Sequence, residues 1–313
     1  MKKLKKKLSS IVEEIKDVKV HYIDYPMHHN IGDLLIYLGT ENFFKENDIN
    51  VVGRYSLYDA DIILNTNIVK PNDVLVFHGG GNFGDIYLVC QKLRENLISR
   101  FPNNKIVILP QSIYFRYQVN LKKSSEIISA HKNVVIYVRD EESLSIAKLF
   151  SDKVYLMPDM AHSLYETSFI HDIKAQTSIV SNELFLARTD KEVADNSMFN
   201  NTNSDNIFDW FDLVSDKQEL KRKLLSILAR TLGKRVYLAR FISGLWYEQA
   251  IDLSYKGGVK LLSTNDFYTN RLHGMIFSQL LDRTVFMKDN SYGKNSRYYR
   301  LWFKNSKLVR WVD

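Results

Sequence analysis

Along the first half of the chain, short apolar runs alternate with stretches whose apolar residues recur at helical intervals. This alternation is the strongest constraint on the fold. The runs are VHYIDY, DIILN, DVLVFHGGG, KIVILPQS, NVVIYVRD and KVYLMPD, at residues 20–25, 61–65, 73–81, 105–112, 133–140 and 153–159. Strands in a parallel sheet form such continuous runs because helices cover both faces of the sheet. We therefore predict an α/β fold with a doubly wound parallel sheet, in which these runs are the strands.

A polar stretch at residues 171–182 interrupts this pattern, and a second alternation follows it. The second alternation consists of ELFLART at 183–189, an amphipathic helix at 217–232, VKLLSTN at 259–265, a helix after Arg271 and TVFMKDN at 284–290. A repeated alternation of this kind is typical of a second α/β unit. We expect two Rossmann-like domains, residues 1–175 and 176–313, which face each other across a central cleft.

The formal charge of +7 favours anionic partners such as phosphates, acidic lipids or nucleic acid. Five lysines lie within the first seven residues, and one helix face carries Leu4, Leu8, Ile11, Ile15 and Val18. This segment is either a solvated helix docked on the body or a helix that rests on an anionic inner membrane leaflet. The lysines cluster at one end rather than along an aromatic-bearing groove, so nucleic acid is not an expected partner.

The basic N-terminus is not followed by the apolar core of a signal peptide. The sequence also contains no stretch of about 18 apolar residues, so we expect no membrane span. Its single cysteine, Cys90, excludes an internal disulfide and a cysteine-based zinc cluster. We expect a cytoplasmic protein, with peripheral contact at the cytoplasmic membrane face if the N-terminal helix rests there.

The segment HHNIGDLL at residues 28–35 joins a predicted strand to a predicted helix. Asn30 and Gly32 can shape a turn, and Asp33 can cap the helix that follows. The exposed N–H groups at such a helix start suit an anion or a sugar hydroxyl. The alternative is an ordinary strand–turn–helix junction.

The segment HGGGNFGD at 78–85 places three consecutive glycines after a buried strand, where the backbone can approach a ligand closely. The spacing matches neither the dinucleotide fingerprint nor a P-loop. An esterase oxyanion hole would need a G-x-S-x-G elbow, which the sequence lacks. Asn82 and Asp85 are therefore candidate ligand contacts rather than a catalytic pair.

Candidate anion contacts lie at the ends of later elements. Arg139 ends a predicted strand, where doubly wound sheets bind ligands, although it could instead pair with the acids beside it. Asp159 and His162 follow the next strand and are expected at the same cleft. Arg271 and His273 begin a helix, a compact site for a phosphate or carboxylate unless they only flank a capped helix.

The segment DNSYGKNSRYYRLW at 289–302 places Lys294 in a glycine turn beside Tyr292, with Arg297 and Arg300 following. These residues could clamp a phosphate or stack on a sugar. The alternative is a C-terminal helix that its aromatic side chains anchor to the body.

Together these segments resemble the polysaccharide pyruvyl transferase family, most closely its bacterial exopolysaccharide and capsule members. The resemblance rests on NIGD (30–33), HGGGNFGD (78–85), PQS (110–112), VRDEES (138–143), PD (158–159), RLHG (271–274) and NSYGKN (290–295), in the family's order. It implies a GT-B-like fold. It also implies an enzyme that moves a pyruvyl group from phosphoenolpyruvate to a pair of sugar hydroxyls in a cell-surface polysaccharide.

The resemblance also implies where the two substrates bind. The donor residues would be Arg139, Arg271, His273, Tyr292 and Lys294. The acceptor residues, nearer the NIGD segment and the glycine loop, would be Asn30, Gly32, Asp33, Gly79, Gly80, Gly81, Asn82 and Asp85. Phosphoenolpyruvate is a co-substrate, so no resident cofactor is expected, and no residue cluster is typical of a metal site.

We expect His273 to be the general acid or base, because imidazole exchanges protons near neutral pH. Arg271 and its cationic neighbours would hold the donor's phosphate and carboxylate and stabilise the developing charge. Asp33 or Asp85 would orient or deprotonate the acceptor hydroxyl. The acceptor would be a sugar or a lipid-linked oligosaccharide, and a basic N-terminal helix would suit the latter.

Two other functions fit the same features. A GT-B glycosyltransferase that uses a nucleotide sugar would need a similar basic cleft, since fold alone does not fix function. A non-catalytic protein that binds a glycan or nucleic acid would also tolerate the basic charge.

Overall fold

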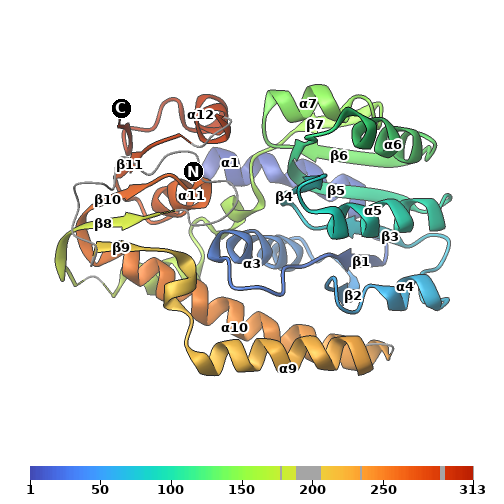
Figure 1. Cartoon of the computed structure of the whole chain (residues 1–313), viewed down its shortest axis with the longest axis horizontal. Helices are drawn as coiled ribbons and strands as arrows, with labels where there is room; N and C mark the ends of the chain where they lie inside the picture. The colour runs from blue at the N-terminus through green and yellow to red at the C-terminus, as the bar shows by residue number, and fades with distance from the viewer. Residues whose placement is uncertain (177, 188–205, 233–234, 290–292, 313) are drawn as a thin grey trace.

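The computed structural model describes residues 1–176, 178–187, 206–232, 235–289 and 293–312 (Figure 1). Two parallel sheets organise this part of the chain. The first sheet has the order β2-β1-β3-β5-β6-β7, with β4 paired to β5. Its strands are β1 (Val20–Ile23), β2 (Val51–Tyr55), β3 (Val74–Phe77), β4 (Gly80–Gly84), β5 (Lys105–Tyr114), β6 (Val134–Val138) and β7 (Lys153–Leu156).

The second sheet has the order β12-β11-β10-β8-β9, and its pairs are also parallel. Its strands are β8 (Ser181–Leu186), β9 (Ile207–Phe208), β10 (Thr264–Thr269), β11 (Val285–Met287) and β12 (Val309–Trp311). The predicted α/β class with parallel sheets is confirmed. The two-domain, GT-B-like arrangement divided at residues 175 and 176 stays a prediction.

Helices cover both faces of the first sheet, as the apolar runs predict. Alternate residues of β3 separate two cores, with Val74 and Val76 on one side and Leu75 and Phe77 on the other. One side carries α3 (Ile31–Glu46) and the N-terminal helices α1 (Lys2–Lys7), η1 (Leu8–Ile11) and α2 (Val12–Ile15). The other carries α4 (Asp61–Asn65), α5 (Leu88–Arg100), α6 (Gln118–Ser129) and α7 (Glu141–Ala147). Each residue of the central strands β1, β3 and β6 thus meets an apolar layer whichever way it points.

The second half of the chain adds helices around its own sheet and beneath the first. They are η2 (Met160–Leu164), α8 (Ser168–Lys174), η5 (Trp210–Leu213), α9 (Asp216–Leu232), α10 (Val236–Leu262), α11 (Leu272–Leu280), α12 (Lys294–Tyr298) and the π-helical turn η6 (Tyr299–Phe303). The long helix α10 packs on α3, β2 and α9 (Figure 1). Because α3 and α11 share one hydrophobic core, the sheets are not independent layers.

Two sequence predictions of secondary structure are wrong. Residues 61–65 form α4 rather than a strand, and the strand lies earlier, at β2. A five-residue apolar run is too short to show a helical or a strand period, so its apolar character could not distinguish a helix from a strand. Residues 259–262 end α10, and β10 begins only at Thr264. Glycines keep this part of α10 close to its neighbours: a Cβ at Gly258 would lie 2.8 Å from both Ile173 Cγ2 and Phe277 Cζ.

The basic N-terminal segment is docked on the body. Leu8, Ile11 and Ile15 are buried, and Lys5 Nζ donates to Glu46 Oε1 at 2.8 Å and to the Tyr165 carbonyl at 3.0 Å. Of its two expected placements, the docked helix is therefore the one observed. Membrane contact by this segment stays a prediction. In the described part of the chain, every helix falls short of the length or apolar character that a membrane span requires.

Helix α3 contacts η2 so closely that one of its positions admits only glycine. A Cβ at Gly39 would lie 2.2 Å from the Met160 carbonyl oxygen, which is backbone and cannot rotate away. By contrast, nothing lies within 4 Å of a Cβ at Gly244 in α10. We predict that Gly39→Ala lowers the free energy of unfolding by about 1–3 kcal/mol through overpacking.

The matched change Gly244→Ala should raise the same free energy by roughly 0.5–1 kcal/mol, because alanine loses less backbone entropy in a helix. Urea unfolding of both variants measures the effect. Equal shifts of the two variants in one direction would contradict the close α3–η2 contact.

Candidate active site

A cavity of about 390 Å³ opens where the carboxyl ends of the first sheet's strands meet the second half of the chain. Asp24, His78 and Arg139 line it, and they follow β1, β3 and β6 in turn. Arg271, Leu272 and His273 at the start of α11 line the opposite side with Lys294 of α12. Ligands of doubly wound sheets bind at such strand ends, so this cavity is the candidate active site.

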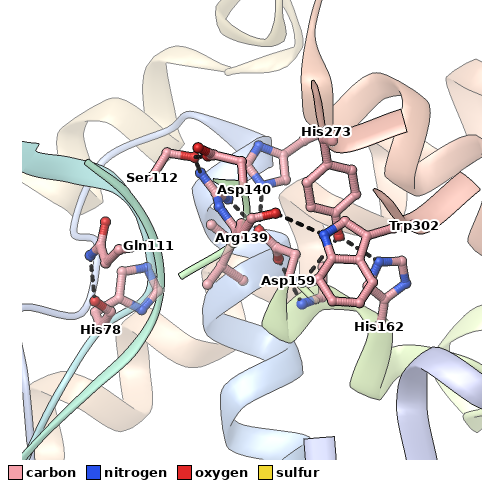
Figure 2. A network of polar contacts seen from close by, with 12 residues as sticks. His78, Gln111, Ser112, Arg139, Asp140, Asp159, His162, His273 and Trp302 are labelled. Atoms are coloured by element: carbon pink, nitrogen blue, oxygen red, sulfur yellow. Dashed lines mark hydrogen bonds and ion pairs between the residues drawn. The ribbon is translucent and has the colours of Figure 1, made fainter. Parts of the chain in front are cut away.

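The centre of the site is a buried ion pair between Arg139 and Asp159 (Figure 2). Arg139 Nη2 also donates to Ser112 Oγ at 3.1 Å, and Trp302 Nε1 donates to the Arg139 carbonyl at 2.8 Å. His273 Nε2 lies 3.4 Å from the same Asp159 oxygen that Arg139 contacts. The guanidinium is therefore fixed in place before any ligand binds.

Asp159 keeps its negative charge in this setting. Burial alone would raise its pKa, but the Arg139 guanidinium and the hydrogen bond with His273 hold the pKa well below the ordinary value. The alternative interpretation, that Arg139 pairs with the acids beside it in sequence, is wrong. Asp140 instead caps α7 by accepting from Ser143 N at 2.8 Å.

The NIGD segment lies directly against His273. A Cβ at Gly32 would lie 2.7 Å from His273 Nδ1, so this position admits only glycine. Asn30 caps α3 by accepting from Gly32 N at 3.1 Å, and its Nδ2 donates to Asp33 Oδ2 at 2.9 Å. Burial raises the pKa of Asp33, but His28, His273 and other cationic groups outweigh it and lower the pKa overall. Residues predicted for acceptor and donor thus share one cavity.

The glycine segment is not the expected turn but the short strand β4, which pairs with β5. Gly79 and Gly81 line the cavity, whereas Gly80 is not among its lining residues. A Cβ at Gly81 would lie 2.9 Å from Lys294 Nζ and 3.7 Å from Arg139 Nη2. Glycine therefore lets two cations from distant parts of the chain approach the same backbone.

Asp85 is not brought to the cavity. Its carboxylate accepts from the backbone N–H groups of Arg116 and Tyr117, at 2.6 and 2.9 Å, and from Asn120 Nδ2 at 3.0 Å. Burial raises the pKa of Asp85, but these hydrogen bonds together outweigh it and lower the pKa overall. Asp85 holds the loop before α6, and it is not among the residues that line the cavity.

Arg271 lines the cavity, but its guanidinium is also committed to the protein. Its Nη2 donates to both carboxylate oxygens of Asp209, at 2.6 and 2.5 Å, and Asp209 in turn caps η5. The sequence gives no sign of this pair, because the two residues are distant in the chain. Lys294 begins α12 directly after Gly293, whose φ of 67° favours glycine. Tyr292 lies outside the described residues.

His162 lies behind the cavity, contrary to the expectation that it faces the cleft. It is fully buried, and its Nε2 is 2.7 Å from the Tyr298 hydroxyl (Figure 2). The same hydroxyl accepts from Asp159 N at 3.0 Å. His162 and Tyr298 therefore support Asp159 from behind. Arg297 forms an ion pair with Glu142 instead of reaching the cavity.

The sequence analysis missed Asp24, which lines the cavity with a φ of 64°. Its Oδ2 accepts from Asn82 Nδ2 at 2.8 Å, and Asn82 Oδ1 accepts from Arg94 Nη2 at 2.9 Å and Gln111 Nε2 at 3.0 Å. Asn82, predicted to contact the acceptor, is therefore occupied in holding this carboxylate. The signal that could have found Asp24 is a lone acid ending the apolar run at β1.

Burial changes the protonation of two residues in the cavity wall. It raises the pKa of Asp24 to about 6, although the nearby Arg94 guanidinium and the Asn82 hydrogen bond oppose the shift. It lowers the pKa of His78 to about 3, so this imidazole is neutral at physiological pH. Among the described residues, no group of three or more His, Cys, Asp or Glu side chains is placed to hold a metal ion.

Comparison with known proteins identifies the family. The sequence model of the polysaccharide pyruvyl transferase family matches residues 30–292. The chain belongs to this family. It is 36% identical over 315 residues to the Bacillus subtilis (strain 168) protein named "Putative pyruvyl transferase EpsO", covering 99% of this chain and 94% of that one. Pyruvyl transferase 1 of Schizosaccharomyces pombe is 28% identical over 312 residues, covering 93% and 71%.

A solved structure of a functionally uncharacterised Klebsiella pneumoniae protein has the same fold, with a TM-score of 0.62, 19% identity and full coverage of both chains. The resemblance that the motifs predict is thus confirmed, and so is the enzyme class. The cavity belongs to a polysaccharide pyruvyl transferase, an enzyme of pyruvyl transfer in polysaccharide biosynthesis.

The raised pKa of Asp24 makes the stability of this transferase depend on pH. The folded protein binds this proton more tightly than the unfolded chain, so the contribution of Asp24 to stability falls as pH rises from about 4 to about 6. We predict that Asp24→Asn removes this dependence. The difference in free energy of unfolding, Asp24→Asn minus native protein, should increase by roughly 2–3 kcal/mol as the pH rises across that window.

Urea unfolding at several pH values measures this difference, with the exposed Asp152→Asn as the matched control. The control should follow the native pH dependence. If Asp24→Asn follows it as well, Asp24 does not carry a raised pKa.

Proposed function

We propose that the enzyme transfers pyruvate from phosphoenolpyruvate to two hydroxyls of a sugar in a cell-surface glycan, forming a cyclic ketal. The observation that carries this proposal is the grouping of Arg139, Lys294 and His273 around the glycine backbones of Gly32 and Gly81. Phosphoenolpyruvate carries a phosphate and a carboxylate close together, and it needs several fixed cations within a small space.

The ion pairs of the two arginines suit this task. Arg139 is held by Asp159 and Arg271 by Asp209, so neither guanidinium has to be ordered when the donor binds. Preorganised charges stabilise a developing ion better than groups that must first reorient. We assign the donor to the part of the cavity next to Gly81, with Lys294 and Arg139 as its first charged contacts and Arg271 behind them.

The chemistry begins with a proton. His273, whose Nε2 lies 3.4 Å from Asp159 Oδ2, gives a proton to the methylene carbon of phosphoenolpyruvate, and positive charge develops on the central carbon. A sugar hydroxyl oxygen bonds to that carbon and releases its proton. The bond from this carbon to the phosphate oxygen breaks, phosphate leaves, and the second hydroxyl closes the ring. Of the two hydroxyl protons, one replaces that of His273 and the other leaves with phosphate.

Asp24 and Asp33 are the two candidates to receive the hydroxyl proton, and their pKa values are shifted in opposite directions. Asp33 has a lowered pKa and is a weak base, so we assign it to orienting the acceptor with Asn30. Asp24 has a pKa of about 6, which is better matched to proton exchange near neutral pH. We place the reaction in the cytoplasm, where phosphoenolpyruvate is a metabolite.

Binding of the donor gives the most direct test. Phosphoenolpyruvate at about 100 times its dissociation constant should raise the free energy of unfolding by about 2.7 kcal/mol. Lys294→Met should weaken this binding about tenfold or more through loss of a charged contact. The exposed Lys304→Met removes the same charge away from the cavity and should bind as the native protein does. Stabilisation by a nucleotide sugar, and none by phosphoenolpyruvate, would replace the proposed donor.

The role of His273 is tested by turnover. We predict that His273→Ala lowers turnover about 100-fold or more, because it removes the proposed proton donor. Phosphate release that depends on the acceptor measures the rate, and thermal unfolding checks that the variant is folded. The exposed His171→Ala in α8 is the control and should leave turnover unchanged. Near-native turnover of His273→Ala would remove this histidine from the chemistry.

A further inference from the structure

Helix α9 carries an apolar stripe that faces solvent. Its members Leu220, Leu224, Ile227 and Leu228 are 59%, 53%, 54% and 37% exposed. They recur at intervals of four, three and one residues, which places them on one face of the helix. The opposite face is already used, since Leu225 and Ala229 are buried in the core. The stripe is therefore a second apolar surface that the fold itself does not cover.

Basic side chains flank this α9 stripe on both sides. At about 100° per residue, Lys221 lies at one edge, and Lys223 and Arg230 lie at the other. The acids of the helix, Asp216 and Glu219, lie in its first turn. An apolar stripe bordered by cations is typical of helices that lie in the plane of a membrane surface.

The first turns of α10 extend the exposed surface. Tyr237 and Phe241 are 63% and 62% exposed, and Arg235 and Arg240 are exposed beside them. Figure 1 shows α9 and α10 side by side along one edge of the molecule. Aromatic side chains prefer the boundary between headgroups and acyl chains. Both helices thus present apolar and basic groups together.

We propose that the α9 stripe, with Tyr237 and Phe241, binds an anionic lipid bilayer. The charge on this surface favours a bilayer over a second copy of the chain. A symmetric pair would bring two sets of lysines and arginines together, which costs energy, whereas anionic lipids attract each cation by about 1 kcal/mol. The apolar side chains gain further by leaving water.

The stripe lies beside the wall of the active site. The Arg230 guanidinium is 4.6 Å from the centre of the Tyr58 ring, and Tyr58 lines the cavity with Leu57. Phe211, which is 52% exposed and also lines the cavity, lies just before α9 in the chain. A bilayer against α9 would therefore lie next to this wall. We infer that the acceptor is a sugar on a lipid carrier, an inference that rests on the proposed pyruvyl transfer.

The N-terminal lysines are a weaker candidate for the same role. Lys2, Lys3, Lys6 and Lys7 are exposed, but the apolar face of their segment is buried in the protein. This segment can attract anionic lipid but has no comparable apolar stripe to insert. Figure 1 shows α1 and α9 well apart, so variants can separate the two surfaces.

Vesicle flotation tests the proposal directly. The full-length native protein should bind vesicles of phosphatidylglycerol and phosphatidylcholine better than vesicles of phosphatidylcholine alone. The double variant Leu224→Glu, Ile227→Glu should bind the anionic vesicles at least about tenfold more weakly, since it removes two inserted side chains and adds repulsive charge. Val119→Glu is the control, because Val119 is 73% exposed on α6, and it should bind as the native protein does.

Three results would overturn the proposal. The first is unchanged binding by the double variant while it remains folded. The second is complete loss of binding when the four exposed N-terminal lysines become glutamine, which would move the contact to α1. The third is a native dimer, seen by light scattering, that the double variant converts to a monomer without any change in flotation.

Activity assays separate this proposal from the proposed function. With a water-soluble sugar acceptor the double variant should retain native turnover, because neither changed residue lines the cavity. With a lipid-linked acceptor in anionic vesicles its turnover should fall with its binding. Equal turnover of both proteins on the vesicle acceptor would show that the α9 stripe does not bring the enzyme to a lipid-linked acceptor, and would overturn the inferred link between the two. Absence of transfer from phosphoenolpyruvate to either acceptor, with flotation intact, would refute only the proposed function.

Discussion

The buried ion pair between Arg139 and Asp159 connects most of the site. The Asp159 carboxylate accepts from Ala161 N and pairs with Arg139, and the Asp159 N–H donates to the Tyr298 hydroxyl, so this residue links the first sheet to the C-terminal helices. Removing one partner of such a pair costs about 3–5 kcal/mol, because the other charge stays buried without compensation. The same pair sets the position of His273. Stability and catalytic geometry therefore depend on one contact at the junction of the two sheets.

Close backbone packing is the second requirement of the site. His273 occupies the space that a side chain at position 32 would fill, and Lys294 occupies the corresponding space at position 81. Each glycine lies in the first half of the chain, and each partner lies in the second half. Gly32 and Gly81 therefore admit a side chain from the other half of the chain, whereas Gly80, with a φ of 119°, is favoured by its backbone conformation.

Much of this arrangement can be predicted from the sequence, and the remainder depends on tertiary contacts. Apolar periodicity predicts the buried strands and the helix at 217–232. The presence of Arg139 and His273 at the site is predicted by their places at a strand end and at a helix start. The partner of Arg271 could not be predicted, because Asp209 meets it only through folding. Asp85 was misassigned for the same reason, since a loop distant in sequence uses its carboxylate.

The buried charges also bear on the proposed anionic donor, which would bind next to two carboxylates. Asp33 remains ionised because several cationic groups surround it, whereas Asp24 has a pKa of about 6 and gains a proton readily. A bound phosphate and carboxylate would raise the pKa of Asp24 further by repulsion. The donor would then favour a protonated Asp24, and departure of phosphate would favour its ionised form. The negative charge of the bound donor would therefore change how readily Asp24 takes up the proton that the acceptor hydroxyl must release.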